Sequence, residues 1–331
     1  MSERKKDHIQ LAFKGRMYAD ELDSRFNYEP MLSGHPPHEL ADITFLGKSM
    51  KAPIWVSSMT GGTEKAGHIN RNLARACREF GLGMGLGSCR SLLRNNDYLK
   101  DFDFRELIGN DLPFWANLGI CQVEELLMNE ELDRIEELVT KLQADGLIIH
   151  INPIQEWLQP EGDTLWHRPL DVIERFLERS EIKIIVKEVG QGIGPESLLS
   201  LMRLPIEAIE FAAFGGTNFS KIEMMRSEDE IRDNFYPLAA IGHTAEEMVE
   251  VVNKAVGSNQ EINCRQIIIS GGIKTFLDGY YLINKIQLPA IYGQASAFLR
   301  YAQGPYDHLQ EFVKSQVDGL KLAGAYLKIK H

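Results

Sequence analysis

The sequence predicts a single (β/α)8 barrel. Short apolar runs alternate with amphipathic stretches, there are eight such runs, and each is followed by a polar residue or a glycine. Strands that alternate with helices form a parallel sheet, and eight of them close into a barrel. The strands are expected at residues 54–57, 82–86, 114–117, 147–152, 184–187, 208–211, 267–270 and 290–292.

Amphipathic stretches between these runs are expected to be helices, at residues 69–80, 123–143, 170–179, 244–256 and 276–286. Residues 212–265 form an insertion between strands 6 and 7, and long insertions in compact domains are usually functional. Residues 1–52 are expected to be an N-terminal arm packed on the barrel, with a strand near residues 43–46 that closes one barrel end. Residues 53–331 form the barrel. An open doubly wound sheet is the alternative, but no Gly-x-Gly-x-x-Gly motif opens a helix.

Composition excludes several classes of protein. A formal net charge of −11 argues against a dedicated nucleic-acid binder, which needs a basic face. The four cysteines lack the close paired spacing of a zinc site. No apolar run is long enough to cross a membrane and the N-terminus does not resemble a secretion signal, so we expect a cytoplasmic protein. We also expect a homo-oligomer.

The fourth expected strand carries the densest group of polar residues. His150 and Asn152 lie two residues apart and therefore point to the same face of the strand. Pro153 should end the strand and leave Gln155 and Glu156 on the following loop. A lone histidine at a strand end is more often structural than catalytic, but four polar groups together favour a site at this position.

Other strand ends predict a site for a phosphorylated, planar ligand. The small residues Gly215-Gly216-Thr217 and Gly271-Gly272 let backbone N–H groups approach an anion, although tight packing is the alternative reading. Lys187 ends an apolar run and should point into the site, unless it only pairs with Glu188 or another carboxylate. Asn117 offers both a donor and an acceptor to an imide edge. This combination of features describes FMN.

A diphosphate with a metal ion is the second predicted ligand. Glu156 is an oxygen ligand of the kind that Mg²⁺ prefers together with phosphates. The basic run Arg4-Lys5-Lys6, with His8 and Arg90, could neutralise those phosphates. A solvated tail is the alternative for the N-terminal run, unless the arm folds over the site.

Taken in order, these motifs resemble the FMN-dependent type 2 isopentenyl diphosphate delta-isomerases. The most specific element is His150-x-Asn152-x-x-Gln155-Glu156 followed by residues 160–163, Pro-Glu-Gly-Asp. The resemblance covers most of the chain and extends over Arg4-Lys5-x-x-His8-Ile9, Ser58-Met59-Thr60-Gly61-Gly62, Gly87-Ser88, Asn117-Leu118-Gly119, Val186-Lys187-Glu188, residues 215–223 and Ser270-Gly271-Gly272.

The resemblance implies that the protein interconverts isopentenyl and dimethylallyl diphosphate on reduced FMN, with NADPH as the reductant and Mg²⁺ held by Glu156. Reduced flavin would shuttle the proton that an ordinary side chain moves poorly. The implied FMN contacts are Ser58, Met59, Thr60, Ser88, Asn117, Lys187, Thr217, Gly271, Gly272, Ala295 and Ser296. The implied substrate contacts are Arg4, Lys5, His8, Ser88, Arg90 and Gln155, and the implied catalytic residues are Gln155, His150, Asn152 and Lys187.

Four positions depart from the usual family residues. Cys89 stands where Gln is usual, Gly194 where Ser is common, Glu210 where Asp is usual and Ala213 where Gly is usual; the helix beginning at Phe276 is also bulkier than the family form. Two other readings stay open. One is another FMN barrel such as a 2-hydroxy acid oxidase, for which the expected His-Gly-x-Arg pattern is missing. The other is a flavin- or phosphate-binding relative without catalysis.

Overall fold

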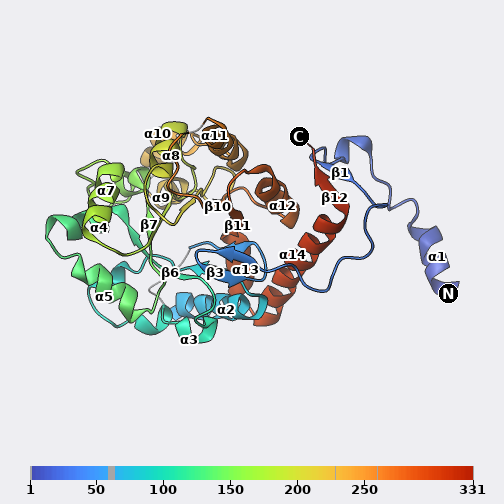
Figure 1. Ribbon diagram of the computed structural model, residues 1–331, viewed down its shortest axis with the longest axis horizontal. Helices are drawn as coiled ribbons and strands as arrows, with labels where there is room; N and C mark the ends of the chain where they lie inside the picture. The colour runs from blue at the N-terminus through green and yellow to red at the C-terminus, as the bar shows by residue number, and fades with distance from the viewer. Residues whose placement is uncertain (1, 59–63, 228, 259, 331) are drawn as a thin grey trace.

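The described chain folds around a closed parallel barrel (Figure 1). The computed structural model describes residues 2–58, 64–227, 229–258 and 260–330. Within these ranges eight strands close in the order β10-β11-β4-β5-β6-β7-β8-β9, which confirms the predicted fold class. The barrel strands are β4 Ile54–Val56, β5 Gly83–Gly85, β6 Phe114–Gly119, β7 Leu147–His150, β8 Ile184–Lys187, β9 Ala208–Glu210, β10 Ile267–Ser270 and β11 Ala290–Gln294.

Each expected strand overlaps an observed one, because strands buried on both faces need nearly continuous apolar sequence. The predicted end of the fourth strand was wrong. β7 ends at His150, and Gln155 and Glu156 lie on the short helix α6, Pro153–Leu158, rather than on a loop. Proline at the first helical position lacks only an N–H that has no partner in the helix, and its φ suits the helix.

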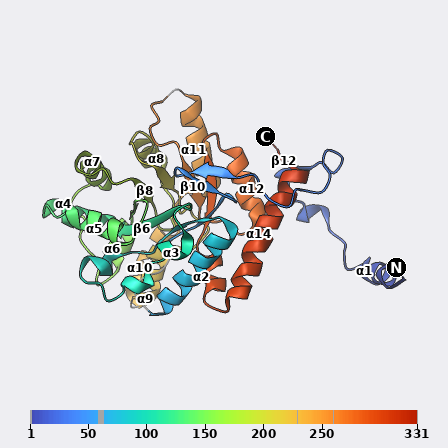
Figure 2. The ribbon, with the colours of Figure 1, turned by 60° about the horizontal axis from the view of Figure 1, so that its bottom comes forward.

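Helices surround the barrel (Figure 2). The expected helix at residues 123–143 is in fact two helices, separated where Glu130 adopts a positive φ of 59°. The helices are α1 Ser2–Leu11, α2 Glu64–Phe80, α3 Arg105–Ile108, α4 Ile120–Met128, α5 Asp133–Lys141, α6 Pro153–Leu158, α7 Pro169–Arg179, α8 Pro195–Met202, α9 Phe219–Arg226, α10 Asp229–Ala239, α11 Ala245–Gly257, α12 Phe276–Lys285, α13 Ser296–Ala302 and α14 Tyr306–Tyr326.

A hairpin of β2, Ile43–Phe45, and β3, Lys48–Met50, closes the amino-terminal end of the barrel. Phe45, Leu46 and Met50 are buried in one apolar cluster with Trp55 and Trp115 of the barrel strands. The strand expected near residues 43–46 is therefore confirmed, and this end of the barrel is filled with side chains.

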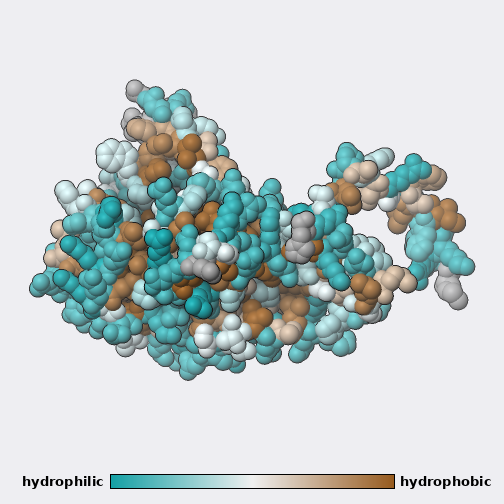
Figure 3. Space-filling view, turned by 45° about the horizontal axis from the view of Figure 1, so that its top comes forward, coloured by the Kyte–Doolittle hydropathy of each residue, from teal (hydrophilic) through white to brown (hydrophobic). Residues whose placement is uncertain are grey.

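The segment before this hairpin lies outside the barrel. β1, Phe26–Tyr28, pairs antiparallel with the C-terminal strand β12, Leu327–Ile329. Helix α1 is the outermost element in both ribbon views, beyond α14 (Figures 1 and 2). The arm stands apart from the body in the space-filling view, and the side chains of Ile9, Phe13 and Met17 are exposed (Figure 3).

None of the helices in the described ranges combines the length and the apolar character that a membrane span requires.

Candidate functional site

Two adjoining cavities open at the carboxyl ends of the barrel strands, where α/β barrels carry their chemistry. The first, of about 440 Å³, lies over strands β9, β10, β11 and β4. The second, of about 220 Å³, lies over β6 and β7 and below helix α6. Ser58, Lys187, Val189 and Phe219 line both cavities. The two cavities therefore form one continuous site.

Glycines shape the outer part of the first cavity. Gly215, Gly271 and Gly272 have φ values of 112°, 86° and 73°, which side chains rarely tolerate. A Cβ at Gly215 would lie 3.2 Å from the Cα of Gly272, so the two loops nearly touch. Lys274 and Arg300 are exposed residues that also line this cavity. Exposed backbone and two cations are the features of an anion site.

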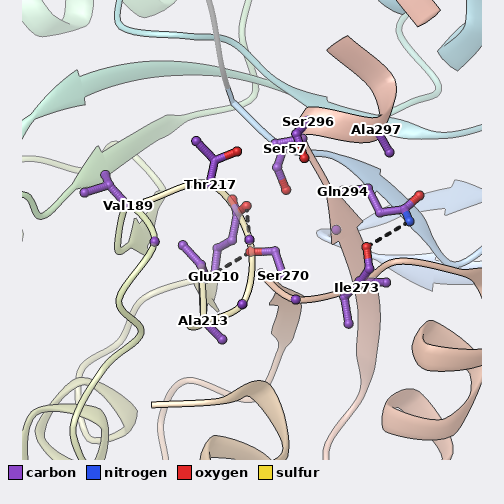
Figure 4. Close-up of a pocket in the computed structure, with 18 of the residues that line it drawn as sticks. Ser57, Val189, Glu210, Ala213, Thr217, Ser270, Ile273, Gln294, Ser296 and Ala297 are labelled. Atoms are coloured by element: carbon purple, nitrogen blue, oxygen red, sulfur yellow. Dashed lines mark hydrogen bonds between the residues drawn. The ribbon is translucent and has the colours of Figure 1, made fainter. Parts of the chain in front are cut away.

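Buried polar atoms line the inner wall of the first cavity (Figure 4). The side chains of Ser57, Ser58, Glu210 and Gln294 each carry a buried oxygen that has no hydrogen-bond partner within the described part of the chain. Buried polar atoms are normally paired, because leaving one unpaired costs about 1–3 kcal/mol. This wall is therefore shaped to receive hydrogen bonds from a ligand.

Lys187 lies between the two cavities and is almost fully buried. Its Nζ donates to the backbone carbonyl of Glu188 at 2.7 Å. The Glu188 carboxylate instead accepts three backbone N–H groups, from Gly190, Gln191 and Gly192. Burial raises the pKa of Glu188. The ammonium of Lys187 thus keeps donors for a ligand, and Glu188 fixes the loop beside it.

His150 and Asn117 form a pair on the floor of the second cavity. The Nδ1 of His150 lies 2.7 Å from the Oδ1 of Asn117, so the imidazole donates to the amide oxygen. Burial, with a smaller effect from the positive charge of Lys187, lowers the pKa of His150 to about 3. His150 is therefore neutral at physiological pH, with Nε2 as a hydrogen-bond acceptor.

Gln155 is held from two sides. Its Oε1 accepts from the Nδ2 of Asn152 at 3.2 Å, and its Nε2 donates to the Oε1 of Glu223 at 3.1 Å. The Oε2 of Glu223 accepts from Arg226 at 2.6 Å, and Glu223 is buried. These contacts orient the Gln155 amide at the wall of the second cavity.

Glu156 is buried, and donors surround its carboxylate. Oε1 accepts from the Nδ2 of Asn152 at 2.9 Å, and Oε2 accepts from Gln159 and from the backbone N of Asp163, both at 2.8 Å. A carboxylate has about four acceptor positions, so one remains. Among the described residues, no group of three or more acidic, His or Cys side chains has the geometry of a metal site.

Arg90 closes the outer side of the second cavity. Its guanidinium pairs with Asp163 at 2.8 Å, and Asp163 also accepts from Gln122 at 2.8 Å. Arg90 is partly exposed and lines the cavity together with Ser88. Both residues can therefore contact an anion that enters from solvent.

The structure brings most of the predicted site residues together. Those that line one or both cavities are Ser58, Ser88, Arg90, Asn117, His150, Asn152, Gln155, Glu156, Lys187, Thr217, Gly271, Gly272, Ala295 and Ser296. Arg4, Lys5 and His8 lie on the exposed helix α1 at the edge of the molecule (Figure 1), and none of them lines either cavity. Met59 and Thr60 lie outside the described residues.

The sequence reasoning missed two buried carboxylates. Glu223 contacts Gln155 across 68 positions of sequence, and no local pattern links the two residues. Glu210 was noted only as a departure from the family, although a charged residue at the end of the buried strand Ala208–Glu210 is a local signal. Of the other departures, Ala213 lines the first cavity, whereas Phe276 packs on Gly319 of α14.

The fold defines a (β/α)8-barrel protein, and two adjoining polar cavities lie at the carboxyl ends of its strands. No family model matches the chain. The isopentenyl-diphosphate delta-isomerase of Rickettsia felis is 34% identical over 327 residues, covering 97% of this chain and 91% of that protein. The enzyme of the same name from Rickettsia africae is 34% identical over 330 residues, covering 97% and 92%. The chain belongs to the isopentenyl-diphosphate delta-isomerase family.

Solved structures share the fold at low sequence identity. A mandelate oxidase mutant with the monooxide FMN adduct matches with a TM-score of 0.55 and 14% identity, covering 92% of this chain and 87% of that chain. A flavocytochrome b2 mutant with benzoylformate matches with a TM-score of 0.61 and 11% identity, covering 90% and 70%. At this identity the likeness extends to the barrel alone.

Proposed function

We propose that the protein interconverts isopentenyl and dimethylallyl diphosphate as a type 2 isomerase, which uses reduced FMN and Mg²⁺ and takes NADPH as the reductant. One observation carries the proposal: the two cavities meet at Lys187. The first contains the glycine loops and cations suited to an anion, and the oriented Gln155 amide lines the second. A flavin in the first cavity would face a small substrate in the second.

The residues of the first cavity fit FMN. The glycines with positive φ and the cations Lys274 and Arg300 suit its phosphate. The unpartnered buried oxygens of the wall suit a ligand rich in hydroxyl donors. Lys187, which lines both cavities, and Asn117, which lines the second, suit the polar edge of the ring where the cavities meet. The bound FMN adduct of the mandelate oxidase neighbour, at 14% identity, is consistent with this assignment.

The second cavity fits a diphosphate with one metal ion. Glu156 has one acceptor position left for Mg²⁺, and phosphate oxygens and water would supply the remaining ligands. Arg90 and Ser88 would bind the diphosphate from the solvent side. Neutral His150 would accept or relay a hydrogen bond through Nε2 rather than act as a cation.

The residues that line the two cavities then have the following roles in the isomerisation. Reduced FMN, when bound, supplies an electron-rich ring that can hold and return a proton. Gln155 orients the reacting carbons and does not titrate. Asn152 and Glu223 hold the Gln155 amide, and Lys187 stabilises negative charge on the neighbouring ring edge. The bound diphosphate supplies the binding energy that positions the hydrocarbon.

The basic residues of α1 require a separate step. Arg4, Lys5 and His8 can contact a diphosphate only if the arm reaches a site, either its own or that of a second copy. The exposed side chains of Ile9, Phe13 and others on the arm favour burial against another surface. A homo-oligomer in which arms meet neighbouring copies would satisfy both requirements.

One assay tests the proposal. The full chain is incubated anaerobically with isopentenyl diphosphate, FMN, Mg²⁺ and NADPH, and dimethylallyl diphosphate is measured. Product should form only when FMN and a reductant are both present, and the purified protein should be yellow and bleach with NADPH. A protein that takes up FMN without forming product is the binding-only relative, and one that takes up no FMN contradicts the proposal.

A further inference from the structure

Glu210 is the most unusual residue of the first cavity. Its side chain is fully buried at the end of β9, and it lines the cavity. Oε1 accepts from the Oγ of Ser270 at 3.1 Å, and the Ser270 hydroxyl accepts in turn from the backbone N of Ala212 at 2.9 Å (Figure 4). Oε2 has no hydrogen-bond partner in the described part of the chain. The carboxylate is thus fixed on one side and unpaired on the other.

A buried carboxylate oxygen without a partner calls for a hydrogen-bond donor from outside the chain. The donor cannot be an anion, because a phosphate would be repelled by the carboxylate. Ser57 and Gln294 add two more unpartnered buried oxygens to the same cavity. This wall therefore matches a neutral group that carries several donors, which is the chemistry of a polyol.

The position of Glu210 in the first cavity indicates which part of a bound flavin it would contact. Lys274 comes two residues after Gly272 in the sequence, and it lines the first cavity together with Arg300. Lys187 pairs with Glu210 in the register of β8 and β9 and also lines the second cavity. Of the two cavities, Glu210 lines only the first, and its strand β9 lies between β8, which ends at Lys187, and β10, which leads to Gly271 and Gly272. In FMN, the part between the phosphate and the ring is the ribityl chain, so Glu210 lies where that chain would lie.

We infer that Glu210 binds a hydroxyl of the ribityl chain of FMN and so fixes the direction in which the flavin enters the barrel. The inference rests on the proposed flavin site. With the phosphate at the glycine loops and the polyol over Glu210, the ring extends towards Lys187 and Asn117. The negative charge of Glu210 also excludes the opposite orientation, in which a phosphate would occupy the inner wall.

Three flavins separate this role from a structural one. FMN carries ring, polyol and phosphate; riboflavin lacks the phosphate; lumiflavin has the ring without the polyol. Their dissociation constants are measured by quenching of flavin fluorescence with the full chain, for the wild type, Glu210→Met and Glu210→Asp. Loss of a hydrogen bond to a charged group should weaken FMN and riboflavin binding by about tenfold or more. Lumiflavin binding should change little, and Glu210→Asp should lie between the other two proteins.

The melting temperature of the flavin-free protein supplies a second readout. Removal of an unpaired buried carboxylate should raise the melting temperature of Glu210→Met without flavin, while flavin binding falls. Gln316→Met is the matched control. Gln316 is buried on α14 and also has an oxygen without a partner among the described residues, but it lies outside both cavities. This control should gain stability and keep wild-type affinity for all three flavins.

Each outcome decides a different point. Equal weakening of lumiflavin and riboflavin in Glu210→Met, or no weakening of either, overturns the role of Glu210 while the flavin site stands. A wild-type protein that binds neither FMN nor riboflavin overturns the proposed function itself. If Glu210→Met does not fold, the flavin affinities of Glu210→Asp still test the inference. This variant keeps the negative charge, and its shorter side chain moves the carboxylate away from the flavin hydroxyl.

Discussion

The two ends of the barrel are built from the same strands and differ in what fills them: packed side chains at one end and two cavities at the other. At the amino-terminal end, Trp55 and Trp115 pack with Ile148, Ile185 and Ile268 under the β2–β3 hairpin. At the carboxyl end, the same strands lead to Ser57, Asn117, His150, Lys187 and Ser270. Side chains fill the first end, and the indole N–H groups of Trp55 and Trp115 are buried there without a partner among the described residues. At the second end the unpaired atoms are oxygens of Ser57, Glu210 and Gln294, which line a cavity that a ligand can enter.

This difference separates stability from function along each strand. Close-packed apolar side chains contribute most of the folding free energy and tolerate little change of volume. The carboxyl end holds polar groups at a cost that only a ligand can offset. Substitutions at the closed end should therefore lower the free energy of unfolding, and substitutions at the open end should alter ligand binding or turnover with little change in stability.

The largest effect is expected at Gln155. Gln155→Asn shortens the side chain, so the amide can no longer both contact Glu223 and face the second cavity. Turnover should fall by orders of magnitude while FMN content, measured by its absorbance, stays at one equivalent. Turnover close to that of the wild type would contradict a role of this amide at the substrate. A loss of FMN would indicate that Gln155 contributes to flavin binding instead.

The closed end can be tested at Phe45. Phe45→Ala leaves a cavity between the hairpin and the barrel floor and should reduce the free energy of unfolding by about 3–5 kcal/mol. Urea denaturation measures the loss. Phe13→Ala is the control, because the Phe13 side chain is 73% exposed, and it should change stability by less than about 0.5 kcal/mol. Flavin affinity of the folded Phe45→Ala protein should equal that of the wild type.

Glu156 tests the open end through the metal. Glu156→Gln replaces a carboxylate oxygen by an amide nitrogen, so the Mg²⁺ concentration for half-maximal activity should rise about tenfold or more. The matched control is Glu161→Gln, an exposed glutamate of the following loop whose Mg²⁺ dependence should stay unchanged. Activity of the wild type that is independent of Mg²⁺ would withdraw the ligand assignment.

The stability of the protein at low pH tests His150 at the open end. Its pKa of about 3 in the folded protein lies below its ordinary value of 6.5, so the unfolded chain binds more protons between these values. The stability due to neutral His150 is complete above about pH 6.5 and is lost as the pH falls towards 3, by at most about 1.4 kcal/mol per unit. His150→Gln should flatten this decline between pH 6.5 and 4.5. Substitution of the exposed His308 by Gln should not change it.

The barrel could be predicted from sequence because its buried strands carry a strong local signal. Ile184–Lys187 and Ile267–Ser270 match the expected bounds, since their apolar residues are flanked by polar ones. Helix α6 was missed because Pro153 both ends a strand and begins a helix, and six residues give little periodicity. The break between α4 and α5 was missed because it depends on the positive φ of Glu130, and a glutamate does not predict a positive φ.

The site could be predicted where each side chain follows its own strand. Asn117, His150 and Lys187 lie at strand ends, and parallel strands bring their carboxyl ends together. Glu223 could not be predicted, because the insertion folds back over α6 through contacts between α9 and α6. The position of α1 could not be predicted either, because residues 3–11 are exposed and no burial pattern fixes their place.

The pairing of β1 with β12 ties residues 26–28 to residues 327–329. During synthesis residues 26–28 are made long before their partner strand, and the last barrel strand, β11, also precedes that partner, so the barrel can close while the arm is still untethered. A chain shortened to end before Leu327 should therefore keep a folded barrel, and protease should cut it around residues 26–28 faster than it cuts the chain that carries β12.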